Sequence, residues 1–240
     1  MEDQAHLMVN PATTEPSPER TAPGGGSELT PSRRPRLAVF GGSFDPVHNG
    51  HLFVAGEMVR GGHADEVLFV PARQPPHKID LDLAPANHRL AMLRLALAFY
   101  PEFSVSDIEL SREAGPSYTF DTLETLRQVF PEHEIRFLLG MDNLIDLHRW
   151  YRATELVQHY ELLIYPRPGV STPSFAALAA HFGDRMARKL AKSVVALPEM
   201  PVVATEIRAD LVRGRTVAGR CPESVLGYIR DHGLYGSRPA

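Results

Sequence analysis

The 240-residue sequence has a single cysteine, no excess of positive charge and no long uninterrupted apolar run. Because Cys221 stands alone, an intramolecular disulfide is excluded, and a reducing, cytoplasmic compartment is expected. The net charge of −4 argues against a general attraction to nucleic acid or to an anionic membrane. Residues 90–100 are the most apolar stretch, but Arg94 interrupts them, and the N-terminus lacks the basic start and apolar core of a signal peptide. We therefore expect neither a membrane span nor export.

The first 35 residues have few apolar side chains and are rich in Pro, Gly, Ser, Thr and Glu. Such a segment cannot bury enough surface to offset the entropy lost on ordering. We therefore predict a disordered N-terminal extension over 1–35 and one folded domain over 36–240.

From residue 36 onward, short apolar runs alternate with amphipathic stretches. The apolar runs predict six strands, at 37–40, 67–70, 103–105, 135–139, 162–165 and 194–197. Helical spacing predicts helices at 52–59, 87–100 and 118–130, and a further helix that opens within 204–208. Strands separated by helices are typical of the α/β class, here a Rossmann-like, doubly wound parallel sheet with helices on both faces. Ligands of such sheets bind at the carboxyl ends of the strands.

The first predicted strand leads into a glycine turn and two histidines, in the sequence F-G-G-S-F-D-P-V-H-N-G-H over 40–51. Gly41 and Gly42 let a ligand approach the main chain, and the start of the following helix directs unpaired N–H groups toward it. His48 and His51 are three residues apart and face the same way, so they would add donors for a phosphate. The alternative is that His48 is a helix cap and His51 an ordinary helix residue. The stretch matches neither G-x-x-x-x-G-K-[ST] nor G-x-G-x-x-G.

The remaining conspicuous clusters fall close to other predicted elements. They are P-A-R-Q-P-P-H-K at 71–78, G-P-S-Y-T at 115–119, G-M-D-N-L at 140–144 with Trp150-Tyr151 beyond, P-R-P-G at 166–169 and A-T-E-I-R at 204–208.

The histidine stretch resembles the signature G-x-F-x-P-x-H-x-G-H of the nucleotidylyltransferase superfamily, and the later clusters narrow the resemblance. Together with the ending Gly233-Leu234-Tyr235, they resemble the bacterial nicotinate-nucleotide adenylyltransferases over about 36–236. The resemblance implies transfer of AMP from ATP to nicotinic acid mononucleotide, with release of pyrophosphate. One departure is Val203, where the family usually has Ser, so a hydroxyl contact to ATP cannot come from this position.

The resemblance implies catalytic roles for His48, His51 and Arg208, which would contact the ATP phosphates and the transition state. The implied ATP site also contains Gly41, Gly42, Ser43, Phe44, Gly140, Asp142 and Thr205. The acceptor phosphate is already ionised near neutral pH, so positioning and electrostatics are expected to suffice without a general base. An ordinary helix cap is the alternative role for Asp142.

For the mononucleotide, the resemblance implies stacking of Trp150 on the pyridine ring. Main-chain N–H groups near Ser117, Tyr118, Thr119 and Tyr151 would hold the nicotinate carboxylate. The candidates for its phosphate are Arg73, His77, Lys78 and Arg167, of which one or two are expected to be bystanders. A core or interface tryptophan is the alternative for Trp150. Mg²⁺ is expected to bind mainly through the ATP phosphates, without a dedicated set of protein ligands.

Three rival functions are the alternatives to this one. An adenylyltransferase for nicotinamide mononucleotide or phosphopantetheine shares the histidine signature, and a nucleotide-sensing protein without catalysis would share the fold. A class I tRNA synthetase is disfavoured, since the chain has no K-M-S-K-S segment. The expected partners are thus ATP and nicotinic acid mononucleotide, without nucleic acid or membrane, and a homo-oligomer is compatible with the sequence.

Overall fold

The computed structural model of the protein describes residues 33–73, 83–112, 117–198 and 200–237. The predicted acceptor-site residues His77 and Lys78, and residues 1–32 of the predicted extension, lie outside these ranges.

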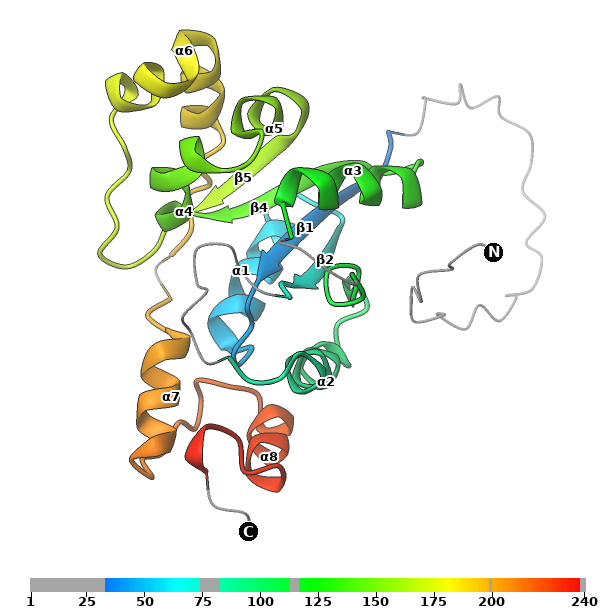
Figure 1. Ribbon diagram of the computed structural model, residues 1–240, viewed down its shortest axis with the longest axis vertical. Helices are drawn as coiled ribbons and strands as arrows, with labels where there is room; N and C mark the ends of the chain where they lie inside the picture. The colour runs from blue at the N-terminus through cyan, green and yellow to red at the C-terminus, as the bar shows by residue number, and fades with distance from the viewer. Residues whose placement is uncertain (1–32, 74–82, 113–116, 199, 238–240) are drawn as a thin grey trace, which may run out of the picture.

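Five parallel strands form one central sheet (Figure 1). Their order is β3-β2-β1-β4-β5, and every neighbouring pair is parallel. The strands are β1 (Arg36–Gly42), β2 (Glu66–Pro71), β3 (Phe103–Val105), β4 (Glu134–Gly140) and β5 (Glu161–Tyr165). The order reverses between β1 and β4, which confirms the predicted doubly wound sheet and marks its switch point.

The prediction of a sixth strand at 194–197 was wrong. Only a single parallel bridge joins Val194 to Ile164 of β5, supported by the Ile164 N–H donating to Ser193 and the Val195 N–H donating to Ile164, both at 2.8 Å. Pro198 follows shortly after, and a proline has no N–H to continue the ladder. The segment therefore reads as a strand in the sequence but pairs only at one point.

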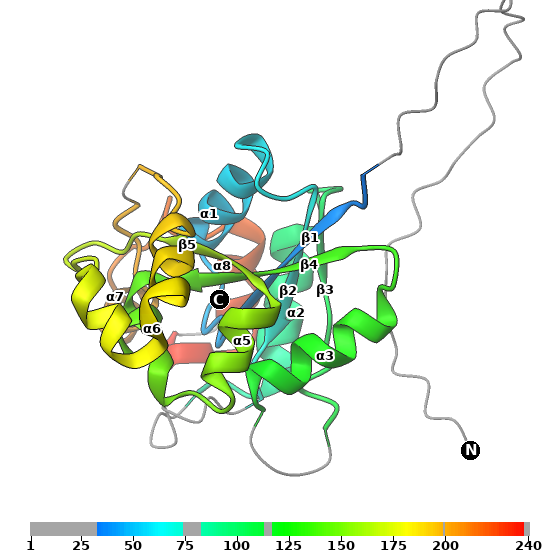
Figure 2. The same cartoon turned by 90° about the horizontal axis from the view of Figure 1, so that it is seen from above.

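Helices cover both faces of the sheet, and consecutive residues of β1 alternate between the two cores. Ala38 and Phe40 face one core, while Leu37 and Val39 face the other. On the side of Phe40 lie α1 (Asn49–Arg60), α2 (Ala86–Leu97), α7 (Ala204–Val212) and α8 (Glu223–Asp231). On the side of Leu37 lie α3 (Thr119–Val129), α4 (Met141–Asp146), α5 (Ala153–His159) and α6 (Phe175–Lys192). Figures 1 and 2 show α1 and α3 on opposite sides of the strands. Two 3₁₀ turns complete the elements, η1 (Leu147–Arg149) and η2 (Leu234–Gly236).

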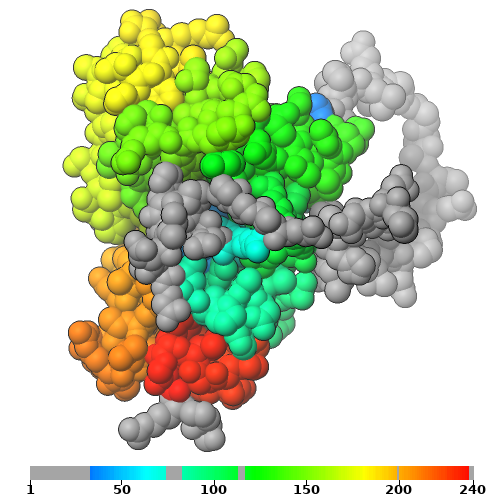
Figure 3. All heavy atoms as spheres, viewed as in Figure 1, coloured from blue at the N-terminus to red at the C-terminus, as the bar shows by residue number. Residues whose placement is uncertain are grey.

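The C-terminal helices fold back onto the first half of the chain. Helix α8 packs on α2, and Figure 3 shows the red C-terminal segment against the teal surface around α2. The described helices include none that is long and apolar enough to cross a membrane.

Helix starts and the domain edge differ slightly from the predictions. Helix α1 begins at Asn49 rather than at 52, which makes His48 its N-cap residue. Before β1, Arg33 donates two hydrogen bonds of 2.7 Å to Asp65. The folded body therefore extends at least to Arg33, and the extension that precedes it stays a prediction.

Candidate functional site

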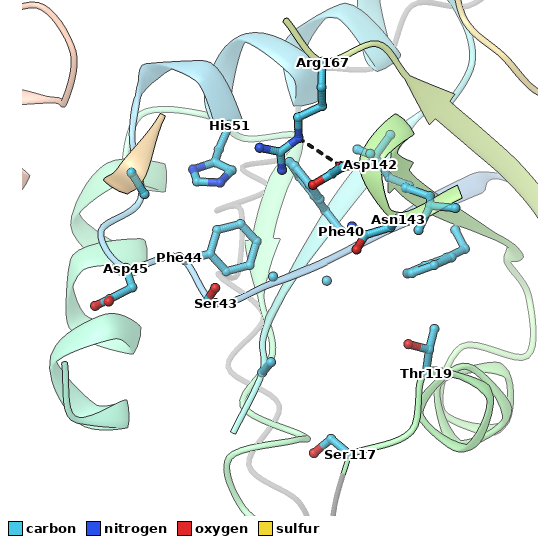
Figure 4. Close-up of a pocket in the computed structure, with 18 of the residues that line it drawn as sticks. Phe40, Ser43, Phe44, Asp45, His51, Ser117, Thr119, Asp142, Asn143 and Arg167 are labelled. Carbon is cyan, nitrogen blue, oxygen red and sulfur yellow. Dashed lines mark ion pairs between the residues drawn. The ribbon is translucent and has the colours of Figure 1, made fainter. Parts of the chain in front are cut away.

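A cavity of about 360 Å³ opens at the carboxyl ends of β1 and β4, the two strands at the switch point. All three predicted catalytic residues line it, and so do the other predicted ATP-site residues, which lie at the end of β1 and in the turn after it, at the end of β4, in α4 and in α7. The predicted mononucleotide residues Ser117, Tyr118, Thr119, Trp150, Tyr151 and Arg167 line it too. In Figure 4, His51 and Phe44 lie on one side of the cavity, and Ser117 and Thr119 lie on the other.

The turn after β1 is shaped by Phe44, which adopts a left-handed φ of 47° and is buried. Its ring packs edge-on against Phe40 at 5.5 Å and against His51 at 5.0 Å between centroids. A Cβ on Gly42 would lie 3.1 Å from this ring, so a side chain there would have to displace the ring slightly. The aromatic cluster thus fixes the backbone of the turn and one face of His51.

His48 and His51 lie face to face at the start of α1, with ring centroids 3.7 Å apart. The His48 main-chain N–H donates to His51 Nδ1 at 3.2 Å. A Cβ on Gly50 would approach the His48 ring to 3.0 Å, which explains the glycine between the histidines. The alternative reading was thus partly right, because His48 occupies the cap position, but both rings line the cavity.

The imidazole of His48 is uncharged. It is only 4% exposed, and its Nδ1 has no hydrogen-bond partner. Burial, followed by the nearby charge of Arg167, lowers the pKa of His48 to about 3. At neutral pH the cavity therefore presents a neutral His48 together with the permanent cations Arg167 and Arg208.

Asp142 and Arg167 form an ion pair that joins the ends of β4 and β5 (Figure 4), with Asp142 Oδ1 3.3 Å from Arg167 Nε. A Cβ on Gly140 would lie 2.5 Å from Asp142 Oδ1 and 3.1 Å from Arg167 Nε. Gly140 is the N-cap of α4, so the alternative role of Asp142 as helix cap was wrong. The glycine leaves the space in which the pair meets.

Arg208 reaches the cavity from the first turns of α7. Its Nη1 donates to the Asp45 main-chain carbonyl at 2.7 Å, and its Nη2 lies 3.5 Å from Thr205 Oγ1. Val203 is the N-cap of α7 and has no side-chain oxygen to cap the helix, so the first N–H groups of α7 lack the usual hydroxyl partner.

The opposite side of the cavity is formed by the start of α3 and by the segment after η1. Helix α3 begins at Thr119 with Tyr118 as N-cap and no side-chain capping bond, so its first N–H groups are open to a ligand. The Tyr118 and Tyr151 rings lie 4.4 Å apart. Trp150 is partly buried and meets Phe137 edge-on at 6.2 Å, so it belongs both to the core margin and to the cavity wall.

Four lining residues with a carboxyl, amide or guanidinium group were missed in the sequence: Asp45, Glu109, Asn143 and Arg149. Asp45 lies inside the histidine signature and Asn143 inside G-M-D-N-L, so their position in the chain was a usable signal. Glu109 and Arg149 belong to no motif that was singled out. Glu109 is buried, and burial raises the pKa of its carboxyl, while Thr122 Oγ1 donates to Glu109 Oε1 at 2.8 Å.

Arg73 is not among the residues that line the cavity, because its Nη1 turns outward to the main-chain carbonyl of Arg112. Of the four predicted phosphate contacts, the described structure therefore brings only Arg167 into the cavity.

The cavity can bind anions and has no nucleophile of its own with an activating partner among its described residues. Its polar groups are imidazoles, guanidinium groups and main-chain N–H groups at helix starts. The carboxylates of Asp45, Glu109 and Asp142 each contact a protein donor or cation. In the described parts of the chain, no three His, Cys, Asp or Glu side chains gather as metal ligands.

Comparison with known proteins gives concordant similarities. A family model described as cytidylyltransferase-like matches residues 39–210. A probable nicotinate-nucleotide adenylyltransferase of Dehalococcoides mccartyi is 40% identical over 203 residues, covering 83% of this chain and 97% of that protein. The nicotinate-nucleotide adenylyltransferase of Bacillus subtilis is 36% identical over 204 residues, covering 84% of this chain and 99% of that protein.

A solved structure of Plasmodium falciparum nicotinic acid mononucleotide adenylyltransferase, complexed with NaAD, has the same fold. It aligns with a TM-score of 0.69 at 20% identity, over 86% of this chain and 100% of that chain.

Proposed function

Since this chain belongs to the cytidylyltransferase-like family and, within it, to the nicotinate-nucleotide adenylyltransferases, we propose that it transfers AMP from ATP to nicotinic acid mononucleotide. The products are nicotinic acid adenine dinucleotide and pyrophosphate, and the reaction belongs to NAD biosynthesis. The observation that carries the proposal is one continuous cavity with His48, His51 and Arg208 toward one side and Trp150 with the start of α3 toward the other.

The chemistry is a direct displacement at the α-phosphorus of ATP. The mononucleotide phosphate attacks, the bond from the α-phosphorus to the pyrophosphate oxygen breaks, and no covalent enzyme intermediate forms. Because the second pKa of a phosphate is near 6, the attacking group is already ionised at neutral pH. The enzyme has to align two anions and stabilise the charge that develops between them.

The two histidines suit this task as hydrogen-bond donors. His51 Nδ1 accepts a hydrogen bond from the His48 main chain, so a neutral His51 carries its proton on Nε2. His48 is neutral because burial lowers its pKa to about 3. We assign both rings to the transferred phosphate, with Arg208 on the leaving pyrophosphate.

The rest of the ATP site follows the turn after β1 and the start of α4. Gly41 and Gly42 allow close approach of the nucleotide, Ser43 and Phe44 offer main-chain N–H groups, and Thr205 lies next to Arg208. We assign Gly140 and Asp142 to the ribose, whose hydroxyls a carboxylate can accept.

A divalent cation, which we propose to be Mg²⁺, fits this cavity if it is bound mainly by the ATP phosphates. Asp45, Glu109 and Asp142 already have protein partners, so phosphate oxygens and water are the ligands that remain. When bound, the cation neutralises negative charge on the pyrophosphate.

The acceptor side of the proposal places the pyridine ring on Trp150 and its carboxylate on main-chain N–H groups of Ser117, Tyr118, Thr119 and Tyr151. Arg167, His77 and Lys78 remain proposed contacts of the acceptor phosphate. Arg73 points away from the cavity, which makes it the expected bystander.

A cytoplasmic location is also proposed, because the single cysteine, Cys221, excludes an intramolecular disulfide.

The experiment that tests the function compares three acceptors with ATP and Mg²⁺, namely nicotinic acid mononucleotide, nicotinamide mononucleotide and phosphopantetheine. Pyrophosphate release and chromatography of the dinucleotide give the rates. We expect the highest kcat/KM with nicotinic acid mononucleotide. A preference for phosphopantetheine would contradict the proposed acceptor. If no acceptor gave pyrophosphate release, the protein would bind nucleotides without catalysing the transfer.

His51→Ala tests the catalytic role of the signature. We expect turnover to fall about a hundredfold or more, as for loss of a transition-state donor, while ATP binding weakens less. His63→Ala is the matched control, since His63 follows the far end of α1 and does not line the cavity. Equal losses in ATP binding and turnover would contradict the assigned role.

A further inference from the structure

The ending Gly233-Leu234-Tyr235 forms a turn that reaches back to the histidine signature. The Tyr235 hydroxyl donates to Asp45 Oδ1 at 2.6 Å, across 190 residues of sequence. Tyr235 adopts a left-handed φ of 57°, between Gly233 at 60° and Gly236 at 70°. Glycine adopts this conformation readily, whereas a tyrosine is strained in it. Strain of this kind persists where the surrounding structure needs the side chain in one place.

Hydrogen bonds to α1 and α8 hold the C-terminal segment that carries this turn. The Asn49 main-chain N–H donates to the Arg220 carbonyl and the Asn49 side chain donates to the Gly219 carbonyl, both at 2.8 Å. Ser237 Oγ donates to the Ile229 carbonyl at 2.9 Å. The segment after α7 is therefore anchored to the first turn of α1 and to α8 at the same time.

Asp45, the target of Tyr235, is a carboxylate with 2% exposure whose two oxygens have different partners. Oδ1 accepts from the Tyr235 hydroxyl and from the Ala84 N–H at 3.1 Å. Oδ2 is buried without a hydrogen bond and lies 3.7 Å from Arg208 Nη1. The same Nη1 donates to the main-chain carbonyl of Asp45 at 2.7 Å.

This arrangement attracts the Arg208 guanidinium without occupying all of its N–H donors. A carboxylate with both oxygens free pairs with a guanidinium through two parallel hydrogen bonds, which would compete with a phosphate for the same fork. With Oδ1 occupied by Tyr235, Asp45 engages only Nη1, and the guanidinium still lines the cavity with 24% of the side chain exposed. Burial is the largest of the causes that raise the pKa of Tyr235, and the hydroxyl thus remains a donor at every pH at which the protein is assayed.

We propose that Tyr235, acting through Asp45, is a positioning residue that keeps the Arg208 guanidinium free to bind the ATP phosphates. The inference rests on the proposed function only in that Arg208 binds ATP. It gives the C-terminal turn a part in the reaction although the Tyr235 side chain does not line the cavity.

Tyr235→Phe tests the proposal, because it removes the hydroxyl and keeps the ring. We expect the Kd for ATP, measured by titration calorimetry without acceptor, to rise about tenfold, the scale of a hydrogen bond to a charged group. The KM for the acceptor should stay within about twofold. The matched control is Tyr228→Phe, which removes a C-terminal hydroxyl that contacts His88 Nδ1 at 2.9 Å, away from the cavity. We expect its ATP affinity to equal that of the wild type.

A double-mutant cycle with Arg208→Ala separates positioning from general support of the fold. If Tyr235 acts through Arg208, adding Tyr235→Phe to Arg208→Ala should weaken ATP binding no further. A full additional loss in the double variant would overturn the proposal, as would equal ATP affinity in Tyr235→Phe and the wild type. Both readouts use ATP alone, so they decide the proposal even if the acceptor proves to be a different compound.

Discussion

At Gly140 a side chain would occupy the space in which Asp142 and Arg167 meet. The atoms that a Cβ would strike belong to flexible side chains, so the backbone can keep its course while the ion pair is displaced. For Gly140→Ala we therefore expect a small loss of stability but a fall in kcat/KM for ATP of about tenfold or more, on the scale of one lost charge-assisted contact. Thermal unfolding and initial rates measure the two effects.

Gly56→Ala provides the control for the Gly140 variant. Gly56 lies within α1, outside the cavity, and the nearest atom to its added Cβ is the end of Arg60 at 3.6 Å. Alanine favours the helix by up to about 1 kcal/mol over glycine, so this variant should be as stable as the wild type or more stable, with unchanged rates. A Gly140→Ala enzyme with wild-type kcat/KM would show that the Asp142–Arg167 geometry is not needed.

His48 should make the protein sensitive to acid. The folded protein keeps this imidazole neutral down to about pH 3, whereas an unfolded histidine ionises near 6.5. Unfolding therefore takes up a proton between these values, and the free energy of unfolding falls as the pH falls through this window. His48→Asn cannot take up this proton. We expect the stability of the wild type relative to this variant to decline from pH 7 toward pH 4 in urea titrations, and parallel curves would contradict the lowered pKa.

Individual site residues could be predicted from the sequence where they belong to a compact motif. Gly42 ends β1, His48 and His51 lie in the motif that follows it, and Asp142 lies just after β4; all four line the cavity. Glu109 gave no such signal, since its role depends on burial and on Thr122, thirteen residues later in another element. The direction of a long side chain could not be predicted either, since the Arg73 side chain donates to the main-chain carbonyl of Arg112 rather than entering the cavity.

Helix α2 contributes the buried side chain of Arg89, which connects several loops. It is 2% exposed and donates to the carbonyls of Ala84, Ser43 and Ala72 at 2.8–2.9 Å and of Arg73 at 3.3 Å. One side chain thereby joins the turn after β1 to the segments after β2 and before α2. The sequence predicted a helix at 87–100 and gave no sign of this role for Arg89.

Arg89→Met should therefore destabilise the protein strongly, because it leaves four carbonyls without this donor. We expect a loss of about 3–5 kcal/mol in the free energy of unfolding, the scale of several buried acceptors left without a donor at about 1–3 kcal/mol each. Urea titration measures it. Arg94→Met is the control on the same helix, where an exposed arginine should change stability by less than about 0.5 kcal/mol. A loss below about 1 kcal/mol for Arg89→Met would contradict the bridging role.

Elements were predictable to different degrees for physical reasons. The five paired strands are apolar runs because both faces of a parallel sheet are buried. Such runs can be recognised in the sequence without knowing the order of the strands in the sheet. The run at 194–197 is equally apolar, yet Pro198 and the preceding helix end leave it one bridge. Helices α4, α5, α6 and α8 were not predicted, since short or interrupted amphipathic segments carry a weak signal; Gly183 breaks the helical geometry inside α6.

At the scale of the whole molecule, the doubly wound topology and the location of the site followed from the alternation of elements. The contact of the C-terminal segment with the turn after β1 did not. The Tyr235–Asp45 contact joins the two ends of the domain, and nothing in local periodicity specifies such a pair. The G-L-Y ending was noticed as a motif, but only the fold shows which residue it meets.

The choice of acceptor depends on both halves of the domain and gives the last prediction. A carboxylate and a carboxamide differ by one charge and by an NH₂ donor, so main-chain N–H groups reward the first and leave the amide nitrogen unpaired. We propose that the first N–H groups of α3 and the N–H of Tyr151, both of which line the cavity, are these donors. Glu109 is the one carboxyl beside Ser117 among the described lining residues, and its Oε1 is already taken by Thr122 at 2.8 Å. We therefore expect kcat/KM for nicotinic acid mononucleotide to exceed that for nicotinamide mononucleotide by at least about a hundredfold.

Trp150→Ala should weaken the binding of both acceptors alike and keep the ratio of their kcat/KM values, because stacking does not distinguish the substituents. Use of both acceptors within a factor of about three, which is less than about 1 kcal/mol of discrimination, would refute the main-chain clamp while leaving the adenylyl transfer itself standing.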